Sequence, residues 1–425
     1  MISSPYPFFQ SLSREITQMQ ADYRRMTPLD PDGLKAAVHG LRQSYVPVLT
    51  DGAFANQLAI VRGHGKEGFM TVVLDPDPSA LAFYSRFAMP VQSPDYMSTP
   101  DDYWSFVLQI GESIRDAGKT PVLTVGDADY LLDSMMDFGP DRLAGVFAIN
   151  QDYRLQQRLM DKYLQYRMAM ESGLPVPSTW LADEAFLQEK PDLDFPVLVK
   201  ERRGRKLFRQ TGKQAFEAGS WKALEEILKA SGQPGELLVQ EKITDGGNEN
   251  MYSIGAYCSR KRRPVAFFSA LRLRPTRQFG SSVLSESSPC PDGVEMMSQF
   301  LKKAGYYGSC EMEFIYDSRR GQLLFLELNN RMYKIQSLAT HCGINFNHLA
   351  LLDAMEKSTP KPPQQMYGPK WWLPWSDIAM GIRKISRGEQ SFREWVAPLS
   401  FDFVNGIDEL DDPLPGFVNL FRGKF

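Results

Sequence analysis

The clearest structural pattern in the chain lies between residues 310 and 332, which read CEMEFIYDSRRGQLLFLELNNRM. Polar and apolar residues alternate in both halves, and because successive side chains of a strand point to opposite faces, the pattern predicts two strands. Gly321 in the connection 317–321 suits the positive φ of a tight turn, so a hairpin is expected. Glu311 and Glu313 then share one face of the first strand. In the second strand Leu323, Phe325, Glu327 and Asn329 share one face, and Leu324, Leu326 and Leu328 share the other.

Two of these carboxylates face each other if the hairpin is symmetric about its turn. Glu313 then lies opposite Glu327, and Glu311 lies opposite Asn329. Carboxylates roughly 5 Å apart across a ladder repel each other, and a bound divalent cation would offset the repulsion. Magnesium prefers oxygen ligands and commonly takes one or two carboxylates beside phosphate oxygens. The candidate metal ligands are therefore Glu313, Glu327 and Asn329.

The same hairpin pattern has a plainer interpretation. Glutamate is common on the solvated outer face of a hairpin, and a bulge of one residue would shift the register. The leucine-rich opposite face favours a half-buried hairpin. The hairpin by itself leaves both interpretations open, so the choice depends on the rest of the chain.

Strand and helix signals alternate through the first third of the chain. Such alternation predicts a parallel sheet covered by helices, hence an α/β domain over residues 1–150. No GxGxxG motif follows the first strand, so a structural domain without a nucleotide of its own is favoured. The expected strands are 45–51, 70–75 and 121–125, and the expected helices are 54–62 and 104–117.

A second domain is predicted over residues 151–358, with a lid lobe at about 178–240. A Pro-rich stretch then opens a C-terminal extension, residues 359–425, whose tryptophans are interpreted as packing anchors rather than as a substrate platform. The expected helices are 152–172, 215–230 and 296–304, and the expected strands are 195–200, 236–243 and a pair within 251–274.

Composition and charge argue against several classes of protein. The formal net charge is −3, so no basic surplus favours nucleic acid. The four cysteines include no CxxC pair, which argues against a zinc site or a disulfide framework. The N-terminus does not read as a signal peptide, and no run approaches the ~20 apolar residues of a membrane span. We expect a cytoplasmic protein without nucleic-acid or membrane partners, and a homodimer is left open.

Four segments, in order, resemble the motifs of the ATP-grasp superfamily, with a layout similar to carbamoyl-phosphate synthase over residues 161–356. The first is Asp161-Lys162 followed by GLPVP, and the second is a strand that ends at Lys200. The third is VQEKI at 239–243, which is similar to the hinge that reads adenine through main-chain groups. The fourth is ELNNR at 327–331, which is similar to the family's E-hydrophobic-N-P-R metal motif.

The first third and the tail are similar to the carboxylate–amine ligase subgroup of this superfamily, which includes D-aspartate ligases. The resemblance covers most of the chain from about residue 48 and implies a parallel-sheet domain ahead of a two-lobed α+β ATP-grasp domain. It rests on Arg62, Gly65, Gly68, Ser85 and Arg86 in the first third, and on Trp371, Asp377 and residues 388–395 in the tail.

The resemblance implies particular cofactors and residue roles. Lys162 and Lys200 would hold the phosphates of ATP as point charges. One or two magnesium ions, or manganese in their place, would bind to the hairpin ligands named above. The adenosine would lie against Gln240, Glu241, Lys242, Ile243, Glu249 and Asn250.

Arginines complete the implied site. Arg331 would stabilise charge on the transferred phosphoryl group or on an acyl phosphate. Arg272 and Arg274, near Arg277, would contact substrate or phosphate, because the fork of an arginine matches both groups. Any one of these arginines or lysines could equally be an ordinary surface charge.

The activity implied by the resemblance is amide formation in two steps. A substrate carboxylate attacks the γ-phosphate of ATP, and an amine then displaces phosphate from the acyl phosphate. Both substrates would be small molecules, such as an amino acid or a peptide-like compound. Two alternatives are an ATP-binding protein without ligase activity and a phosphotransferase.

The chain departs from the family pattern in two places. The loop after Lys200 reads ERRGRKLFRQTGK, where many family members have a glycine-rich cover over the phosphates. It is expected to contact phosphates through its basic side chains or to close over an anionic substrate. Asn330 replaces the usual proline, which should alter the backbone locally without removing a ligand.

Overall fold

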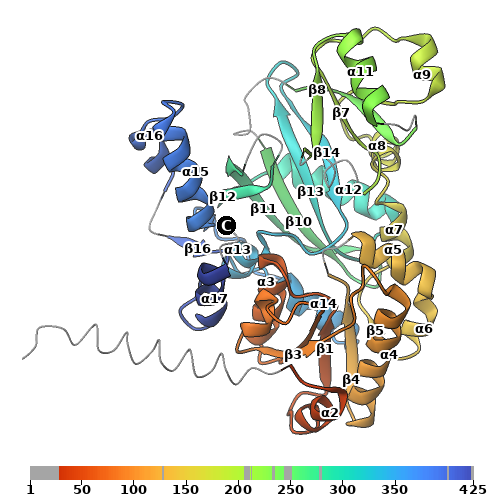
Figure 1. The fold of residues 1–425 in the computed structure, drawn as a ribbon, viewed down its shortest axis with the longest axis vertical. Helices are drawn as coiled ribbons and strands as arrows, with labels where there is room; N and C mark the ends of the chain where they lie inside the picture. Colours follow the sequence, from red (N-terminus) through yellow and green to blue (C-terminus); the bar gives the residue numbers. More distant parts are fainter. Residues whose placement is uncertain are drawn as a thin grey trace, which may run out of the picture. The chain divides into compact units, whose positions relative to one another are not determined.

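The computed structural model describes residues 28–126, 129–204, 211, 213–231, 235–243, 251–276, 280–399 and 402–422 (Figure 1). The chain forms two compact units. The first takes in residues up to 126, 141–149 and those from 407 onward, and the second takes in 127–140 and 150–406. The described residues 407–422 therefore belong with the N-terminal sheet, although they follow the second unit in sequence. The domain boundaries proposed from the sequence remain predictions.

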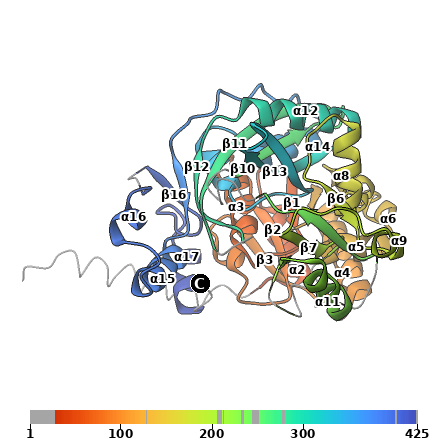
Figure 2. The same cartoon turned by 90° about the horizontal axis from the view of Figure 1, so that it is seen from above.

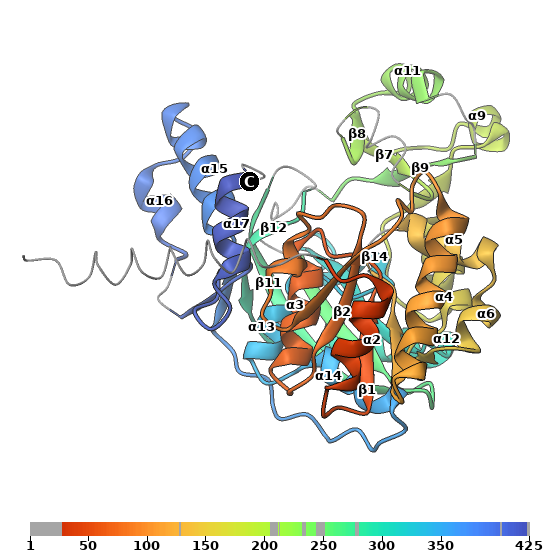
Figure 3. The same ribbon diagram turned by 60° about the horizontal axis from the view of Figure 1, so that its bottom comes forward.

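A five-stranded parallel sheet forms the centre of the first unit, with the strand order β3-β2-β1-β4-β5. The α/β class expected from the alternation is confirmed. Helices α3 and α4 pack on this sheet, and α2 packs on α4 (Figure 3). All residues of β2 are buried, as is usual when both faces of a parallel sheet are covered.

The bounds of the elements in the first unit follow. The strands are β1 (Tyr45–Leu49), β2 (Thr71–Asp75), β3 (Ala88–Gln92), β4 (Thr120–Thr124) and β5 (Ala148–Ile149). The helices are α2 (Pro31–His39), α3 (Ala55–Gly65), the 3-10 helix η1 (Leu81–Tyr84), α4 (Pro100–Asp116), α6 (Pro140–Ala144) and α17 (Leu414–Arg422).

The motif residues of the first third gather around Asp412, just ahead of α17. Arg62 Nε donates to Asp412 Oδ2 at 2.9 Å, and its two Nη atoms donate to the carbonyls of Ile407 and Asp412 at 2.8 Å each. Ser85 Oγ and the Arg86 N–H donate to the same carboxylate, each at 2.8 Å. These bonds hold the last described segment within the first unit and give Arg62, Ser85 and Arg86 a structural role.

Both glycines of that motif are also required by the backbone. A Cβ on Gly65 would come within 2.1 Å of the Phe87 ring, so the ring occupies the space that a side chain would need. Gly68 has a φ of +81°, which residues with a side chain rarely adopt. The motif therefore encodes close packing and a turn.

Two sheets form the second unit. The smaller is antiparallel and has four strands in the order β6-β9-β7-β8. The larger has seven strands in the order β14-β13-β10-β11-β12-β15-β16 and is antiparallel except for its β15–β16 pair. Helix α12 lies along the larger sheet beside β10 and β11 (Figure 2).

The bounds of the elements in the second unit follow. The smaller sheet contains β6 (Thr179–Leu181), β7 (Val197–Glu201), β8 (Ala215–Ala218) and β9 (Leu237–Glu241). The larger contains β10 (Met251–Cys258), β11 (Pro264–Pro275), β12 (Ser282–Ser287), β13 (Gly308–Asp317), β14 (Gln322–Asn329), β15 (Lys370–Trp372) and β16 (Phe403–Asn405). The helices are α5 (Asp129–Phe138), α7 (Tyr153–Arg158), α8 (Lys162–Glu171), α9 (Glu184–Glu189), α11 (Trp221–Ser231), α12 (Pro291–Ala304), α13 (Gln336–His341), α14 (Phe346–Ala354), α15 (Pro374–Ser386) and α16 (Phe392–Val396).

The single helix expected over 152–172 is in fact two helices, α7 and α8. The break occurs because Asp161 caps the second helix: its carboxylate accepts from the N–H groups of Tyr163 at 3.0 Å and Leu164 at 3.2 Å. An aspartate satisfies the first unpaired N–H groups of a helix well. The continuous helical periodicity concealed this local start signal.

The helix expected over 215–230 begins only at Trp221. Residues Ala215–Ala218 form β8 instead, and Phe216 lies opposite Val199 on β7. Pairing to a neighbouring strand outweighs the helix propensity of the alanine and glutamate in this segment. The prediction was therefore wrong for residues 215–220 and correct from Trp221 onward.

The β13–β14 hairpin has the predicted register at its carboxylates and departs from it toward the turn. Phe314 lies opposite Phe325, so Leu326 is an extra residue, a β-bulge between Glu313 and Phe314. The bulge reverses the alternation, and Phe325 lies in the core with Phe314 rather than on the face of Glu327. The expected faces are thus wrong from Phe325 to the turn. Both predicted pairs are present: Glu313 with Glu327, and Glu311 with Asn329.

The four cysteines are buried and free. Among the residues that the structure describes, no helix is both long enough and apolar enough to cross a membrane.

Candidate active site

Three strands of the larger sheet place polar residues in two adjacent rows. Ser253 on β10 lies opposite Glu313 on β13, which in turn lies opposite Glu327 on β14. Residues two apart in a strand share a face, so the next row lies beside the first on the same side of the sheet. That second row consists of Gly255, Glu311 and Asn329.

Each of the two opposed glutamates contacts a cationic side chain. Lys162 Nζ lies 3.0 Å from Glu327 Oε1, and Arg272 Nη2 donates to Glu313 Oε1 at 3.1 Å. Burial would raise the pKa of Glu327, yet its pKa lies below the ordinary value because Lys162 and Lys200 are close. The structure thus brings together four of the residues predicted from the sequence, Lys162, Arg272, Glu313 and Glu327.

The position of Lys162 is set by the cap of its helix. Arg202 Nε and Nη2 donate to the Asp161 carboxylate at 2.6 to 3.0 Å, and the Lys162 N–H donates to the Arg202 carbonyl at 3.0 Å. Although burial raises it, the pKa of Asp161 is lowered overall by Arg202 and by the N–H groups of the helix. Arg202, in the basic loop after β7, therefore anchors the start of α8.

Lys200 lies near the end of β7 and is half-buried. Burial lowers the pKa of Lys200 to about 8, and Glu327 offsets part of that effect. Its Nζ donates to Tyr166 Oη at 2.5 Å, and Tyr166 Oη donates to the Leu326 carbonyl at 2.5 Å. The extra residue of the bulge thus has its carbonyl satisfied by Tyr166, which also holds Lys200.

Sequence reasoning missed Tyr166. The available signal was its position four residues after Lys162 on the same helix, which places both side chains on one face. Tyr166 is 1% exposed, and its ring packs edge-on against Phe325. A large polar side chain buried beside two lysines is a candidate for a site residue.

Glu311, Asn329 and Arg331 form a chain of contacts in the second row. Asn329 Nδ2 donates to Glu311 Oε2 at 3.1 Å, and Arg331 Nη1 donates to Asn329 Oδ1 at 3.2 Å. Burial, followed by the charge of Glu313, raises the pKa of Glu311 to about 7. Arg331 therefore lies next to the amide that was predicted to bind metal.

Asn330 stands where the motif that this segment resembles has proline, and its side chain makes a bond that proline could not make. Its Nδ2 donates to the carbonyl of Gln156 on α7, and the side chain is buried. The bond ties the end of β14 to a helix. The departure from the family pattern thus contributes a structural contact without changing a predicted ligand.

Arg274 lies with the tail rather than with the opposed glutamates. Its Nη1 donates to Asp377 Oδ2, and its Nη2 donates to the carbonyl of Trp395 at 2.6 Å. Trp372 Nε1 donates to the same Asp377 oxygen at 2.8 Å. Arg274 and Asp377 are both buried, so this pair joins β11 to α15 and explains why the tail carries Asp377 among its tryptophans.

The predicted hinge residues lie at the end of β9. Gln240 Nε2 donates to Thr179 Oγ1 at 2.8 Å, and Lys242 Nζ lies 2.6 Å from Glu217 Oε2. The Glu241 N–H donates to the Ser178 carbonyl at 2.9 Å, so this main-chain donor is already paired. Of the other predicted residues, Glu249, Asn250 and Arg277 lie outside the described residues.

The donor set fits a magnesium ion and phosphates. Glu313 and Glu327 offer two opposed carboxylates, and Asn329 offers an amide oxygen beside them. Within the described residues no group of three or more His, Cys, Asp or Glu side chains could hold a metal ion. Magnesium in phosphate-binding sites commonly takes only one or two carboxylates together with phosphate oxygens.

These two sheets, with the carboxylate hairpin, the helix that begins at Lys162 and the strand that ends at Lys200, form an ATP-grasp fold. No family model matches the chain. Over 209 residues it is 27% identical to a D-aspartate ligase from Enterococcus faecium (strain Aus0004), and the match covers 46% of this chain and 49% of that one. The chain therefore spans about half the length of this curated relative.

Solved structures support the same fold. An N5-carboxyaminoimidazole synthetase from Staphylococcus aureus, complexed with ADP, has a TM-score of 0.57 at 18% identity, over 75% of this chain and 79% of that chain. The biotin carboxylase domain of the Hydrogenobacter thermophilus 2-oxoglutarate carboxylase, in complex with MgADP and bicarbonate, has a TM-score of 0.57 at 17% identity, over 77% of this chain and 73% of that chain. At such identities the likeness establishes the fold.

Proposed function

We propose that the protein is an ATP- and magnesium-dependent carboxylate–amine ligase that releases ADP and phosphate. One observation carries this proposal. Glu313 and Glu327 lie opposite each other on one face of the sheet. Lys162 pairs with Glu327, Arg272 pairs with Glu313, and Lys200 lies close to Glu327. The two carboxylates can bind a metal ion, and the neighbouring cationic side chains can bind the phosphates of a nucleotide. The similarity to a D-aspartate ligase and to ADP-bound synthetases agrees with this reading.

Lys162 and Lys200 would neutralise charge on the phosphates of ATP. Lys162 comes from the first turn of α8, and Lys200 comes from the end of β7, so the two amines approach from different elements. Both are held by neighbours, Lys162 by Glu327 and Lys200 by Tyr166. Preorganised charge of this kind lowers the barrier to phosphoryl transfer because no reorganisation is needed during the reaction.

Glu313, Glu327 and Asn329 would hold magnesium, which would supply positive charge against the charge that develops on the phosphates. Arg272 and Arg331 would orient the substrate carboxylate and the acyl phosphate, because each lies beside a predicted ligand. Arg274 remains a proposed catalytic residue, although its contacts favour a role in holding the tail. Closure over the site would exclude water and protect the acyl phosphate from hydrolysis.

The proposed reaction is balanced in two steps. A carboxylate oxygen of the first substrate bonds to the γ-phosphorus, and the bond from that phosphorus to the bridging oxygen breaks, which releases ADP. The amine nitrogen of the second substrate then bonds to the acyl carbon, phosphate leaves with the original carboxylate oxygen, and the nitrogen loses a proton. The substrates are proposed to be an amino acid and an amino acid or peptide-like amine.

An isotope experiment tests this proposal directly. The purified protein is incubated with ATP, magnesium and a panel of amines together with amino acids labelled with ¹⁸O in the carboxylate, D-aspartate first. Amide formation with one ¹⁸O transferred to phosphate is the expected result. ADP release without an amide, or a stable phosphorylated product, would instead identify an ATPase or a phosphotransferase.

A further inference from the structure

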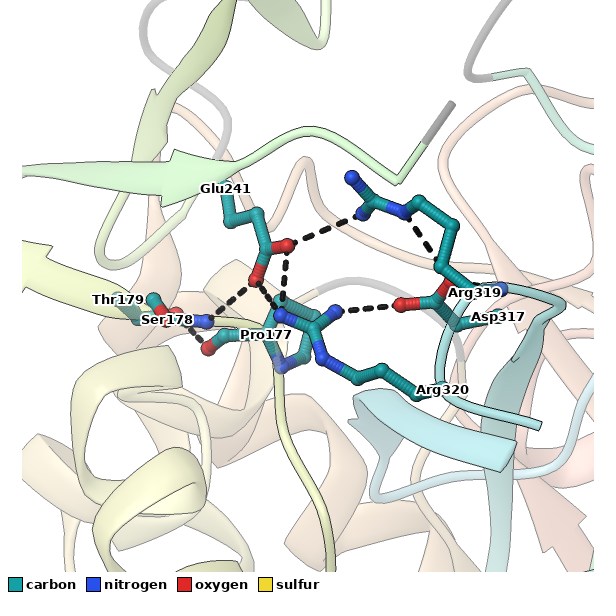
Figure 4. A network of polar contacts seen from close by, with 7 residues as sticks. All are labelled: Pro177, Ser178, Thr179, Glu241, Asp317, Arg319 and Arg320. Atoms are coloured by element: carbon teal, nitrogen blue, oxygen red, sulfur yellow. Dashed lines mark hydrogen bonds and ion pairs between the residues drawn. The ribbon is translucent and has the colours of Figure 1, made fainter. Parts of the chain in front are cut away.

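A second cluster of charges lies at the opposite end of the carboxylate hairpin from the proposed metal ligands. It consists of Glu241 at the end of β9 and of Asp317, Arg319 and Arg320 at the turn between β13 and β14, and we call it the Glu241 cluster (Figure 4). Nothing in the proposed reaction uses these arginines. The sequence analysis treated residues 317–321 only as a turn.

The contacts within the Glu241 cluster are numerous and directional. Arg320 Nη2 donates to both oxygens of Glu241, at 2.8 and 2.9 Å, and Arg320 Nη1 donates to Asp317 Oδ2 at 2.5 Å. Arg319 Nη2 donates to Glu241 Oε1 at 3.2 Å, and Arg319 Nε donates to Asp317 Oδ1 at 3.4 Å. Both arginines therefore link the same two carboxylates, and the four charges balance.

Glu241 is also held from its other side. The N–H of Ser178 donates to Glu241 Oε2 at 3.2 Å (Figure 4). In the main chain, the Glu241 N–H donates to the Ser178 carbonyl at 2.9 Å. The main chain of Glu241 is thus held by Ser178, which directly precedes β6, and its side chain is held mainly by the two arginines. Glu241 is 9% exposed, so its carboxylate is shielded from water.

The Glu241 cluster is unlike an isolated surface ion pair, which contributes little to stability. Asp317 is fully buried, and although burial raises its pKa, the arginines hold the pKa of Asp317 below its ordinary value. The bonds of Arg320 to Glu241 raise the pKa of the Arg320 guanidinium further. Asp317 and Arg320 therefore keep their opposite charges across the ordinary pH range.

The Glu241 cluster lies next to the main-chain segment that was predicted to bind adenine. β9 ends at Glu241 and Lys242 and Ile243 follow directly, and Glu241 and Ile243 are the residues expected from the family resemblance to read adenine through main-chain groups. β13 carries Glu313 four residues before Asp317. The cluster therefore ties the hinge main chain to the strand that bears a proposed metal ligand.

We propose that the Glu241 cluster positions the main chain at Glu241–Ile243 for the adenine base, so that Arg319 and Arg320 control the affinity for the nucleoside part of ATP. This inference rests on the nucleotide-binding part of the proposed function and assigns the two arginines as positioning residues. A misplacement of about 1 Å in such a hinge weakens binding because the hydrogen bonds to the base are directional.

The test separates the base from the phosphates. Calorimetric titrations measure the Kd for ATP, for AMP and for magnesium tripolyphosphate with the wild-type protein and with Arg320→Gln and Arg319→Gln. The expected result is about tenfold weaker binding of ATP and AMP, with tripolyphosphate affinity within about twofold of the wild type. Equal weakening for all three ligands, or for none of them, would overturn the inference.

Neutralising one charge of each sign tests whether the cluster acts only by attracting an anionic ligand. Arg320→Gln removes a positive charge, whereas Glu241→Gln removes a negative one. If the cluster positions the hinge, both variants weaken binding of ATP. If it acts only through Coulomb attraction, Glu241→Gln strengthens binding of ATP, and the inference fails.

Arg262→Ala is the matched control. Arg262 is also a half-exposed arginine in a hairpin turn, and its Nη1 donates to Asp152 Oδ2 at 2.8 Å on another element. Its loss should lower thermal stability to a similar degree and leave all three affinities unchanged. ATP binding without ligation in the wild type would contradict the proposed function and leave the cluster inference intact. A wild type that binds no nucleotide would overturn both.

Discussion

Lys162 and Glu327 are ion-paired at 3.0 Å, although one begins α8 and the other lies near the end of β14. The pair joins the helix that follows the DK motif to the hairpin that carries the proposed metal ligands. Glu327 remains ionised in a half-buried position because Lys162 and Lys200 outweigh the cost of burial. In the proposed function, the carboxylate would therefore bind the metal without a prior change in protonation.

Replacement of Glu327 by glutamine should reduce ADP formation by a factor on the order of 100 to 1000, because one charged oxygen ligand is lost from the site where phosphoryl charge develops. The steady-state rate of ADP release, measured with saturating ATP and magnesium, checks this. Glu295→Gln on the exposed face of α12 is the control and should retain full activity. Near-normal turnover in Glu327→Gln would contradict the metal assignment.

Lys200 should set the alkaline limb of the pH profile of kcat/KM for ATP. Its pKa is lowered to about 8, so the amine is protonated below that pH and loses its charge as the pH rises through it. Since kcat/KM reports the free protein, activity should fall above about pH 8. A flat profile between pH 7 and pH 9.5 would remove Lys200 from the phosphate site.

Tyr166→Phe should move that alkaline limb to lower pH. The variant removes the oxygen to which Lys200 Nζ donates, so the charged form of the amine loses a stabilising bond and the pKa of Lys200 falls further. The pH profile of kcat/KM for ATP measures the shift. Tyr163→Phe on the same helix is the control and should leave the limb in place.

The hairpin illustrates how far local pattern determines this site. The Glu313–Glu327 pair could be predicted because alternation and a glycine turn are features of adjacent residues. The bulge at Leu326 could not, because the carbonyl that it exposes is satisfied by Tyr166, which lies far away in sequence. The faces of β14 beyond the bulge were wrong for the same reason.

The arginines were also hard to place from sequence, because their partners lie far away along the chain. Arg272 was placed in the site by its position in a family-like segment, and it does contact Glu313. Arg274, two residues later, instead bonds to Asp377, whose position relative to β11 no local pattern specifies. The two arginines of the hairpin turn were overlooked because their partner, Glu241, lies on another sheet.

The buried pair Arg274–Asp377 gives a test of whether Arg274 is catalytic. Asp377→Asn should lower stability by roughly 3 to 5 kcal/mol, because it leaves a buried guanidinium without its counter-charge. Replacement of both residues, Arg274→Met with Asp377→Leu, should recover much of that loss. Thermal unfolding measures stability, and ADP release by the double variant decides the role of Arg274. Activity near the wild type would show that Arg274 only holds the tail.

Asp412 offers the corresponding test in the first unit. Asp412→Asn should destabilise the protein by on the order of 3 kcal/mol, because Arg62 is buried and would lose its nearer charged partner, with only Glu409 left at 3.7 Å. Arg62→Lys should be nearly as damaging, since lysine cannot reproduce the forked contacts to Asp412 and to the Ile407 carbonyl. Asp411→Asn, one residue away with an exposed side chain, is the matched control.

Thermal melting combined with limited proteolysis measures the effect of these variants. We expect protease to release residues 407–422 in Asp412→Asn but not in Asp411→Asn. Equal melting temperatures for the two variants would mean that apolar packing of α17, rather than the bonds to Asp412, holds this segment in the first unit.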